Sequence, residues 1–428
     1  MRPRFAGLWR HPDFLRLWAG QIVSAVGNQV GGLALPLLAI IALHADARQM
    51  GLLRAAERAP FLLLALVVGV WVDRRRRRPI LIAADLGRAA LIGAVALAGI
   101  LGRLTMPNLY AAAFLVGVLT VCFDVGYQSY FPGLVGRARL VEGNSTFVVS
   151  GSLVRIAGPG LAGALVQLLT APLALLVDTL SFVVSALSLG AIRAPEPAPP
   201  ARDERRRLWA EIGEGLRLIL STPLLWANAA CRATLVFSGS MILAVYLLYL
   251  NRALGLAPAA IGAILAAGGP SSLLAGALAG RLARSARLGW VLVGAAALAG
   301  AGNLLLPLAS GPPRLAVPLL VAAGWVAGCC GTLYDLLQVS LRQAITPTRL
   351  LGRMTATARF VILGATPLGA LAGGLLGDAL GLRATLLVGA VGSSLAFLWL
   401  LCSPVRKLDT MPAPLAEAEE AATSARGG

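Results

Sequence analysis

Long apolar runs alternate with short polar interruptions along most of the chain. A membrane-spanning helix needs about 20 mostly apolar residues, because the hydrocarbon core of a bilayer is about 30 Å thick. Breaks at charged, Pro and Gly positions leave twelve such runs: 15–43, 49–72, 79–101, 107–130, 145–169, 172–193, 223–250, 258–281, 287–309, 314–338, 352–377 and 382–403. The pattern therefore predicts an all-α membrane protein with twelve transmembrane helices.

A long polar stretch, residues 194–222, separates the first six runs from the last six. Its second part places apolar residues at helical spacing, which predicts an amphipathic surface helix. We expect a cytoplasmic arm over 1–14, an N-terminal six-helix bundle over 15–193, a cytoplasmic linker over 194–222, a C-terminal six-helix bundle over 223–403, and a disordered cytoplasmic tail over 404–428.

Positive charge marks one side of the predicted membrane. Arg and Lys are frequent in the amino-terminal arm, in alternate loops and in the carboxyl tail. The other five loops hold one each, at Arg48, Arg103, Arg252, Arg314 and Arg383. Because cytoplasmic loops retain positive charge, we expect both termini on the cytoplasmic side of a cytoplasmic (inner) membrane.

Composition supports a membrane protein, since 58% of the 428 residues are hydrophobic, 13% are charged and the mean hydropathy is +0.80. Soluble domains are about 45–50% apolar and about 25% charged. A net charge of +18 on a soluble chain would suggest nucleic-acid binding, but here the basic residues recur in every second loop. We expect no nucleic-acid partner, contacts with anionic membrane lipids, and a monomer.

The sequence argues against an enzyme. Its two histidines, His11 and His44, lie outside the predicted spans, and no nucleotide loop, metal-ligand spacing or catalytic triad accompanies them. The cysteines lie inside apolar segments without metal-type spacing, as is typical of small packing residues. We expect no cofactor and no metal.

Features of the first half recur in the second half at a nearly constant offset. Gly69 and Arg74 match Gly276 and Arg281 at an offset of 207, Asp124 matches Asp335 at 211, and Pro159 matches Pro367 at 208. Such recurrence indicates a duplicated six-helix unit, and so a transporter made of two pseudo-symmetric bundles.

The turn GVWVDRRRRRPIL, Gly69 to Leu81, resembles the signature that the major facilitator superfamily carries between its second and third helices. The stretches FLRLWAGQIVSAVGNQV, AERAP and VDTLSFVVSA are similar to the enterobactin-exporter and macrolide-efflux branch of that superfamily. The signature matches at Gly69, Asp73, Arg74, Arg77, Arg78 and Leu81, whereas Arg76 stands where the family usually has Gly. The resemblance extends to about residue 403 and implies the major facilitator fold.

Charged residues at the end of the second helix can pair with neighbouring helix ends when that side is closed. We hypothesise that such a gate comprises Gly69, Asp73, Arg74, Arg77 and Asp124. Asp124 would pair with Arg74 or Arg77, and Asp73 would face the amino end of the eleventh helix. Alternatively, the arginines only fix topology.

The fifth run contains a glycine-rich bend, and Gly158, Pro159 and Gly163 resemble the helix-five motif of proton-coupled antiporters in the superfamily. The resemblance implies export. Small residues beside a proline also let a partner helix approach closely, so a purely structural interpretation stays open.

Carboxylates inside apolar spans are candidates for proton exchange, because a charge in hydrocarbon is expensive unless it faces a cavity or a partner. Asp178 has no cation adjacent in sequence, whereas Glu57 has arginines on both sides. We hypothesise that one of them couples transport to protons, with a hydrogen-bonded core acid as the alternative. Asp85 lies three residues before Arg88, the spacing of a same-face ion pair, and is expected to be structural.

Four further polar residues are candidates for a substrate cavity: Asn28, Arg155, Arg232 and Arg359. Asn28 stands where relatives on the resembling branch often have Asp, so it can hydrogen-bond but cannot carry a proton. Arg155 falls near the middle of its span, where it can bind an anionic substrate group or pair with Asp178.

These features predict a secondary active transporter that exports an amphipathic small molecule, such as a drug or a siderophore, by proton antiport and alternating access. The proton gradient would be its energy source. An importer or facilitator of the same fold is the alternative. A non-transporting membrane scaffold or sensor would have little use for Arg155 and Asp178 in the middle of the membrane.

Overall fold

The computed structural model describes residues 7–136, 139–194, 196, 208–284, 287–347 and 350–410, without the side chains of residues 66, 70, 73, 208–212, 214, 215, 353, 356, 359, 361 and 363. These ranges contain helices and no strand. In chain order the elements are η1 (Leu8–Arg10), α1 (Pro12–Ile41), α2 (Ala47–Asp73), α3 (Arg77–Ile100), α4 (Met106–Val135), α5 (Leu140–Leu169), α6 (Ala171–Gly190), α7 (Leu208–Ser221), α8 (Pro223–Leu248), η3 (Tyr249–Ala253), α9 (Pro258–Ala267), α10 (Gly269–Leu282), α11 (Leu288–Gly302), α12 (Leu305–Leu308), α13 (Pro313–Ile345), α14 (Leu351–Leu380), α15 (Leu382–Leu395), α16 (Leu398–Leu401) and η5 (Pro404–Lys407).

Ten helical segments in the described ranges are long and apolar enough to cross a membrane, and they overlap ten of the predicted runs. The other two runs form α2, with 27 residues, and α14, with 30 residues. The predicted all-α membrane fold is confirmed, and the structure is consistent with twelve spans. α4 and α13 continue beyond their predicted ends, because buried apolar residues such as Val135 and Ile345 still recur there although polar residues interrupt the run.

The chain forms two compact units. Unit 1 comprises Met1–Glu204 and Leu247–Ala266, and unit 2 comprises Arg205–Tyr246 and Ala267–Gly428. The main division lies within the predicted linker. The segment Leu247–Ala266, which includes most of α9, packs with the first unit even though its sequence position is in the second half.

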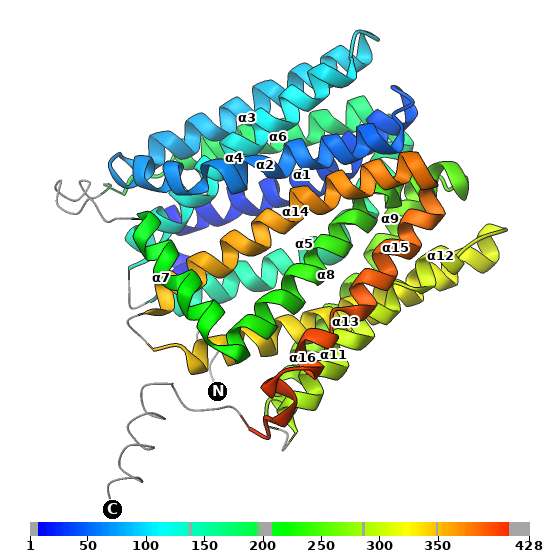
Figure 1. The fold of residues 1–428 in the computed structure, drawn as a ribbon. Helices are drawn as coiled ribbons and strands as arrows, with labels where there is room; N and C mark the ends of the chain where they lie inside the picture. Colours follow the sequence, from blue (N-terminus) through cyan, green and yellow to red (C-terminus); the bar gives the residue numbers. More distant parts are fainter. Residues whose placement is uncertain are drawn as a thin grey trace, which may run out of the picture. The chain divides into compact units, whose positions relative to one another are not determined.

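In unit 1, α6 packs along both α1 and α3, and α4 packs along α2 and α3 (Figure 1). The α1 face against α6 carries Gly20, Gly27 and Gly31, and a Cβ at any of them would overlap an α6 side chain. Without side chains at these positions the two backbones approach closely. This approach brings the polar residues of α6 into the interior of the unit.

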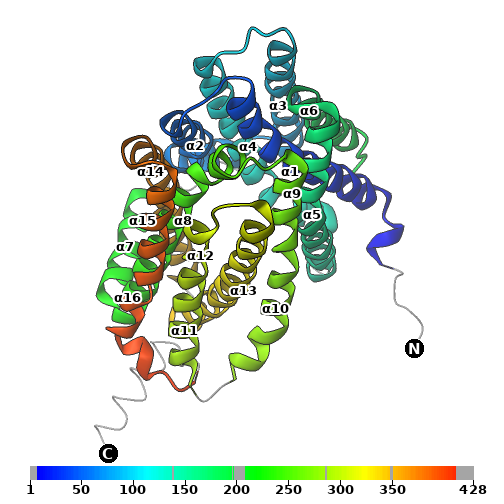
Figure 2. The ribbon, with the colours of Figure 1, turned by 90° about the vertical axis from the view of Figure 1, so that its right-hand side faces the viewer.

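In unit 2, α13 packs along both α10 and α11, as Figure 2 shows. Its core includes Tyr334 and Leu337 of α13 together with Leu292 of α11. The predicted surface helix is present as α7. Its Ile219 is buried against Met354 and Ala358 of α14, which fixes the helix on the unit through its apolar face.

The chain after α16 remains packed for several residues. Val405 is fully buried, and the amides of Leu288 and Gly289 donate to the carbonyls of Asp409 and Leu408 at 3.2 and 2.8 Å. These bonds satisfy backbone amides at the start of α11. The predicted disordered tail therefore has an ordered beginning, and its remainder, 411–428, lies outside the described residues.

Candidate functional site

A buried carboxylate lies where α6 packs on α1. Asp178 of α6 is 4% exposed, and its carboxylate oxygens lie in the space that a Cβ at Gly27 or Gly31 would enter. The two glycines are four residues apart, so they form a notch on one helix face. Ser181 Oγ is 3.5 Å from Asp178 Oδ1. Within the described part of the chain, no ion pair involves Asp178.

A second buried cluster lies further along the same face of α6. Arg88 of α3 is 3% exposed and forms an ion pair with Asp85, which is fully buried. The Arg88 Cζ atom lies 4.4 Å from the ring centroids of both Phe123 of α4 and Phe182 of α6, so two aromatic faces hold the guanidinium. The predicted pair of Asp85 and Arg88 is confirmed. Its contact with Phe182, which lies one turn along α6 from Asp178, could not be inferred from the spacing of residues 85 and 88.

Glu57, the other proton-coupling candidate, is already paired. Arg54 Nη1 lies 3.1 Å from Glu57 Oε2, and Arg58 Nη2 lies 3.4 Å from Glu57 Oε1. The Glu57 side chain is 31% exposed. Glu57 already has two ion-pair partners, so it is a weaker candidate for proton exchange than Asp178.

The five-arginine run forms the short connection between α2 and α3. Arg74 is exposed, and Arg75 stacks on Trp71 with its Cζ atom 4.9 Å from the ring centroid. No atom lies within 4 Å of the position that a Cβ at Gly69 would take. The Asp73 side chain lies outside the described residues. Among the side chains that are described, neither Gly69 nor Arg74 meets a gate partner in this structure.

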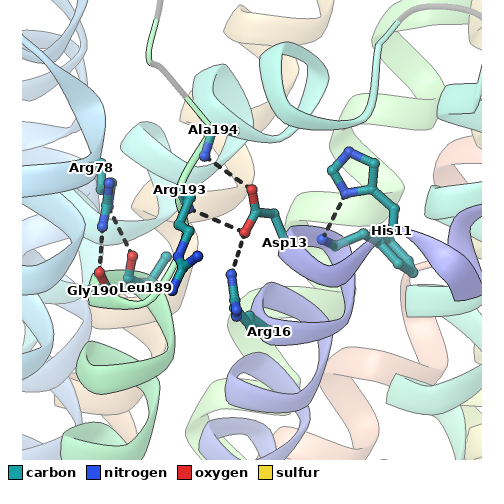
Figure 3. A network of polar contacts seen from close by, with 9 residues as sticks. His11, Asp13, Arg16, Arg78, Leu189, Gly190, Arg193 and Ala194 are labelled. Carbon is teal, nitrogen blue, oxygen red and sulfur yellow. Dashed lines mark hydrogen bonds and ion pairs between the residues drawn. The ribbon is translucent and has the colours of Figure 1, made fainter.

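The start of α3 is tied to the chain that follows α6. The Glu196 carboxylate accepts hydrogen bonds from the backbone amides of Arg77 and Arg78, which places an anion at the positive end of the helix. The Arg78 guanidinium donates to the carbonyls of Leu189, at 2.8 Å, and Gly190 (Figure 3). Arg78 thus holds the end of α6, a role that its position in an arginine run did not reveal.

Asp13 makes a similar tie at the start of α1 (Figure 3). Its carboxylate accepts from the amides of Arg193 and Ala194 at 3.1 and 2.9 Å, and Arg16 Nη1 lies 2.7 Å from Asp13 Oδ1. Sequence reasoning missed this residue, although an acid directly after Pro12 is a helix-start signal. The beginning of the predicted linker is therefore fastened to both α1 and α3.

Asp124 of α4 has different charged neighbours from those hypothesised. Its electrostatic interactions are with the Arg88 and Arg58 guanidinium groups. The gate hypothesis paired it with Arg74 or Arg77 instead. That pairing is not formed in this structure. It stays a prediction for a different conformation of the transporter.

The glycine-rich bend of α5 is a site of close helix packing. A Cβ at Gly163 would lie 2.8 Å from Gly262 Cα in α9 and would overlap the Pro258 carbonyl. A Cβ at Gly158 would lie 2.6 Å from the Gln29 side chain of α1. Pro159 takes part through its carbonyl, which faces Gly262. The small residues therefore serve the close approach that the structural interpretation of this motif predicts.

Two of the cavity candidates lie in unit 1. Asn28 of α1 is exposed, and Arg155 of α5 is exposed and donates to Ser152 Oγ of its own helix at 3.0 Å. The electrostatic interaction of the Asp178 carboxylate is with the Arg88 guanidinium. The pairing of Arg155 with Asp178, one of the two roles predicted for Arg155, is therefore not formed in this structure, where the Arg155 guanidinium bonds within its own helix.

The remaining cavity candidates lie in unit 2. Arg232 of α8 forms an ion pair with Asp335 of α13, with 3.0 Å between Nη1 and Oδ1. Beside it is a cavity of about 20 Å³ that is lined by Arg232, Asn228, Gln338 and Arg342. This volume admits about one water molecule, so the cavity does not accommodate a drug-sized substrate. The Arg359 side chain lies outside the described residues.

The chemistry of unit 1 is that of a buried acid with a fixed cation nearby. No group of three or more His, Cys, Asp or Glu side chains converges on a metal position in the ranges that the structure describes. The cluster provides a carboxylate, hydroxyl groups and a guanidinium. Such a set can hold and release a proton.

Comparison with known proteins places these features in a family. Residues 4–425 match the model of a family described as transmembrane secretion effector. The multidrug efflux pump Tap of Mycolicibacterium fortuitum is 27% identical over 395 residues, which cover 88% of this chain and 92% of Tap. The enterobactin exporter EntS of Citrobacter koseri is 28% identical over 357 residues, with 80% of each chain covered.

Solved structures share the fold. A bacterial homologue of the lysosomal transporter Spinster, in an inward-facing state, has a TM-score of 0.71 at 15% identity over 96% of this chain and 99% of its own. A bacterial homologue of the iron transporter ferroportin, also inward-facing, has a TM-score of 0.70 at 19% identity over 91% of this chain and 98% of its own. At these identities the likeness is one of architecture.

Proposed function

The chain belongs to the transmembrane secretion effector family of the major facilitator superfamily, and from that premise we propose that it exports an amphipathic small molecule by proton antiport. Members of this superfamily are multi-pass membrane transporters for small molecules and are not enzymes. Beyond membership of this family, we propose a direction of transport, an energy source and a substrate class.

The observation that carries the proton-antiport proposal is the environment of Asp178. Its carboxylate is buried between two helices and has no ion pair in the described part of the chain, and the Ser181 hydroxyl beside it donates to the Asp178 backbone carbonyl at 2.7 Å. Burial without an ion-pair partner favours the neutral form of an acid, so an acid in such surroundings can take up a proton. We assign proton exchange to Asp178 and keep Glu57 as the second candidate.

The export direction and the substrate class are supported by the relatives. Tap is a multidrug efflux pump and EntS is an enterobactin exporter, and each aligns with four fifths or more of this chain. We propose a drug-like or siderophore-like substrate, with Asn28 and Arg155 as its candidate contacts in unit 1. Export also agrees with the helix-five motif at Gly158, Pro159 and Gly163.

Alternating access would use the end of unit 1 where α2 meets α3. We propose that this end faces the cytoplasm in an inner membrane, that both termini lie there, and that the chain works as a monomer among anionic lipids. In the state that closes this end, Asp73, Arg74, Arg77 and Asp124 would form the gate, with Gly69 preceding it. No cofactor enters this scheme.

The test is probe efflux from cells that lack other efflux pumps, with and without a protonophore. Ethidium and enterobactin are the two probes. Wild-type protein should accelerate the loss of at least one probe, and the protonophore should abolish the acceleration. Faster probe entry, or efflux that persists without a proton gradient, would contradict the proposal.

Three variants locate the proton carrier. Asp178→Asn should abolish proton-driven efflux while leaving exchange of the probe between equal concentrations intact. Glu57→Gln should keep proton-driven efflux, and loss of coupling in this variant instead would move the role to Glu57. Asp378→Asn is the matched control, because Asp378 is an exposed acid near the end of α14.

A further inference from the structure

The buried face of α6 carries more than one polar residue. Asp178, Phe182 and Ser185 follow one another at intervals of four and three residues, so they lie on one stripe of the helix. Asp178 and Ser185 are 4% and 0% exposed. Phe182 of this stripe packs on Arg88 of α3, the helix that also carries Asp85.

Side-chain contacts at different positions along the helices fix the register between α3 and α6. The ring of Phe182 lies against Arg88, and a Cβ at Gly93 would lie 3.3 Å from the Thr179 side chain. The helices therefore run antiparallel, and Arg88 packs on Phe182, which lies one helical turn along α6 from Asp178. One turn is about 5.4 Å along the axis.

The ion pair with Asp85 uses only part of the hydrogen-bonding capacity of the Arg88 guanidinium. Only Nη2 bonds to Asp85, and Nε is buried without a hydrogen-bond partner. Phe123 and Phe182 pack on the guanidinium plane at 4.4 Å. Aromatic faces attract a cation without neutralising it, so part of the positive field of Arg88 reaches beyond the pair.

Charged groups on the other helices complete the surroundings of this cluster. The elements packed on α6 carry Asp13 and Arg16 in α1, Arg77, Arg78, Asp85 and Arg88 in α3, and Glu142 and Arg155 in α5. Asp124 of α4 follows Phe123 and interacts electrostatically with Arg88. Of these groups, Arg88 is the cation that packs on Phe182, one turn along α6 from Asp178.

We propose that Arg88 is a positioning residue for proton exchange at Asp178, and that Asp85 sets how much of its positive charge Asp178 experiences. The inference rests on the proposed role of Asp178 and deepens it. Arg88 does not carry the proton. It determines the pH at which the Asp178 carboxyl gains and loses one, because a nearby cation favours the carboxylate.

The two members of the pair should therefore act in opposite directions. Asp85→Asn leaves Arg88 unbalanced, so the Asp178 carboxylate is stabilised and its proton leaves at lower pH. Arg88→Gln removes the cation and leaves Asp85, so the proton is retained to higher pH. The double variant Asp85→Asn/Arg88→Gln carries neither charge and should fall between the two.

The measurement is the modification of Asp178 by dicyclohexylcarbodiimide, which reacts with protonated carboxyl groups in apolar surroundings. The full-length protein in detergent is treated over a range of pH, and modification at Asp178 is quantified by peptide mass spectrometry. We expect the midpoint to move down in Asp85→Asn and up in Arg88→Gln by about one to two pH units, the effect of a unit charge one turn away. Arg103→Gln, in the exposed connection between α3 and α4, is the control and should leave the midpoint unchanged.

A purely structural pair would not give shifts of opposite sign. Midpoints that stay in place, or that move in the same direction in both single variants, would overturn the inference. If Arg88→Gln does not fold, Asp85→Asn and the charge-conserving Arg88→Lys decide, with a lowered midpoint expected for the first and a nearly wild-type midpoint for the second.

The reagent reports on Asp178 without any transport substrate, so the two proposals can fail separately. Opposite shifts together with intact proton-driven efflux in Asp178→Asn would support the electrostatic role of Arg88 and overturn the assignment of Asp178 as the carrier. Loss of coupling in Asp178→Asn without midpoint shifts in the pair variants would overturn the role of Arg88 alone.

Discussion

The carboxylate of Asp178 on α6 occupies the space in front of Gly31 on α1, where no Cβ fits. One helix thus provides the acid and the other provides the notch that receives it. The glycine is required because any side chain at this position would enter the space of the carboxylate.

Gly31→Ala should displace the Asp178 side chain. We expect a loss of about 1–3 kcal/mol of stability from overpacking and a loss of proton-driven efflux. Gly32→Ala is the matched control, because Gly32 is exposed and no atom lies within 4 Å of its Cβ position. Thermal unfolding in detergent and ethidium efflux measure the two effects, and equal behaviour of the two variants would contradict the notch.

Arg78→Ala should loosen the end of α6. The change removes the guanidinium that donates to the carbonyls of Leu189 and Gly190, and hydrogen bonds to a charged group contribute about 1.5–3 kcal/mol. Arg75→Ala removes a neighbouring charge that stacks on Trp71 instead. Thermal unfolding should therefore shift clearly only for Arg78→Ala, and matching shifts would show that charge alone matters in this turn.

Gly163→Ala should disturb the packing of α5 on α9, since its Cβ would overlap the Pro258 carbonyl. The expected cost is about 1–3 kcal/mol, with faster hydrogen exchange in the segment 258–266. Gly160→Ala lies on the same bend, and its Cβ would make an ordinary contact of 3.4 Å with Ala266. A comparable increase of exchange in both variants would argue against a specific crossing at Gly163.

Arg232 and Asp335 should be coupled, but only modestly. Their side chains are 27% and 37% exposed, and partly exposed ion pairs contribute about 0.2–1 kcal/mol. A double-mutant cycle with Arg232→Gln and Asp335→Asn, read out by thermal unfolding, measures this coupling. Additive effects of the two substitutions would show that the contact does not stabilise the unit.

The sequence predicted well what depends on local composition. The twelve runs, the surface helix near Ile219 and the pair of Asp85 and Arg88 follow from hydrophobicity and from spacing along a single helix, and all are present. The prediction failed where contacts join distant segments. One role expected for Arg155 was a pairing with Asp178, yet Arg155 bonds to Ser152 of its own helix, because the rotation of each helix in a bundle is set by packing and not by its own sequence.

The same division applies to the charged turn. An arginine run is visible in one sequence, but which arginine bonds to what depends on the neighbouring helix ends. Glu196 at the start of α3 and Arg78 at the end of α6 are more than a hundred residues from their partners along the chain. No periodicity or motif connects such positions.

The sequence by itself determined that this chain is a multi-pass helical membrane protein of a transporter family, since burial of apolar side chains in lipid is a property of each segment alone. The tertiary structure decided which buried acid stands free of an ion pair and which cation lies beside it. The physical reason is that residues of other helices form the environment of a buried acid. The absence of side chains at Gly27 and Gly31 leaves space for the Asp178 carboxylate. The rings of Phe123 and Phe182 pack on the Arg88 guanidinium.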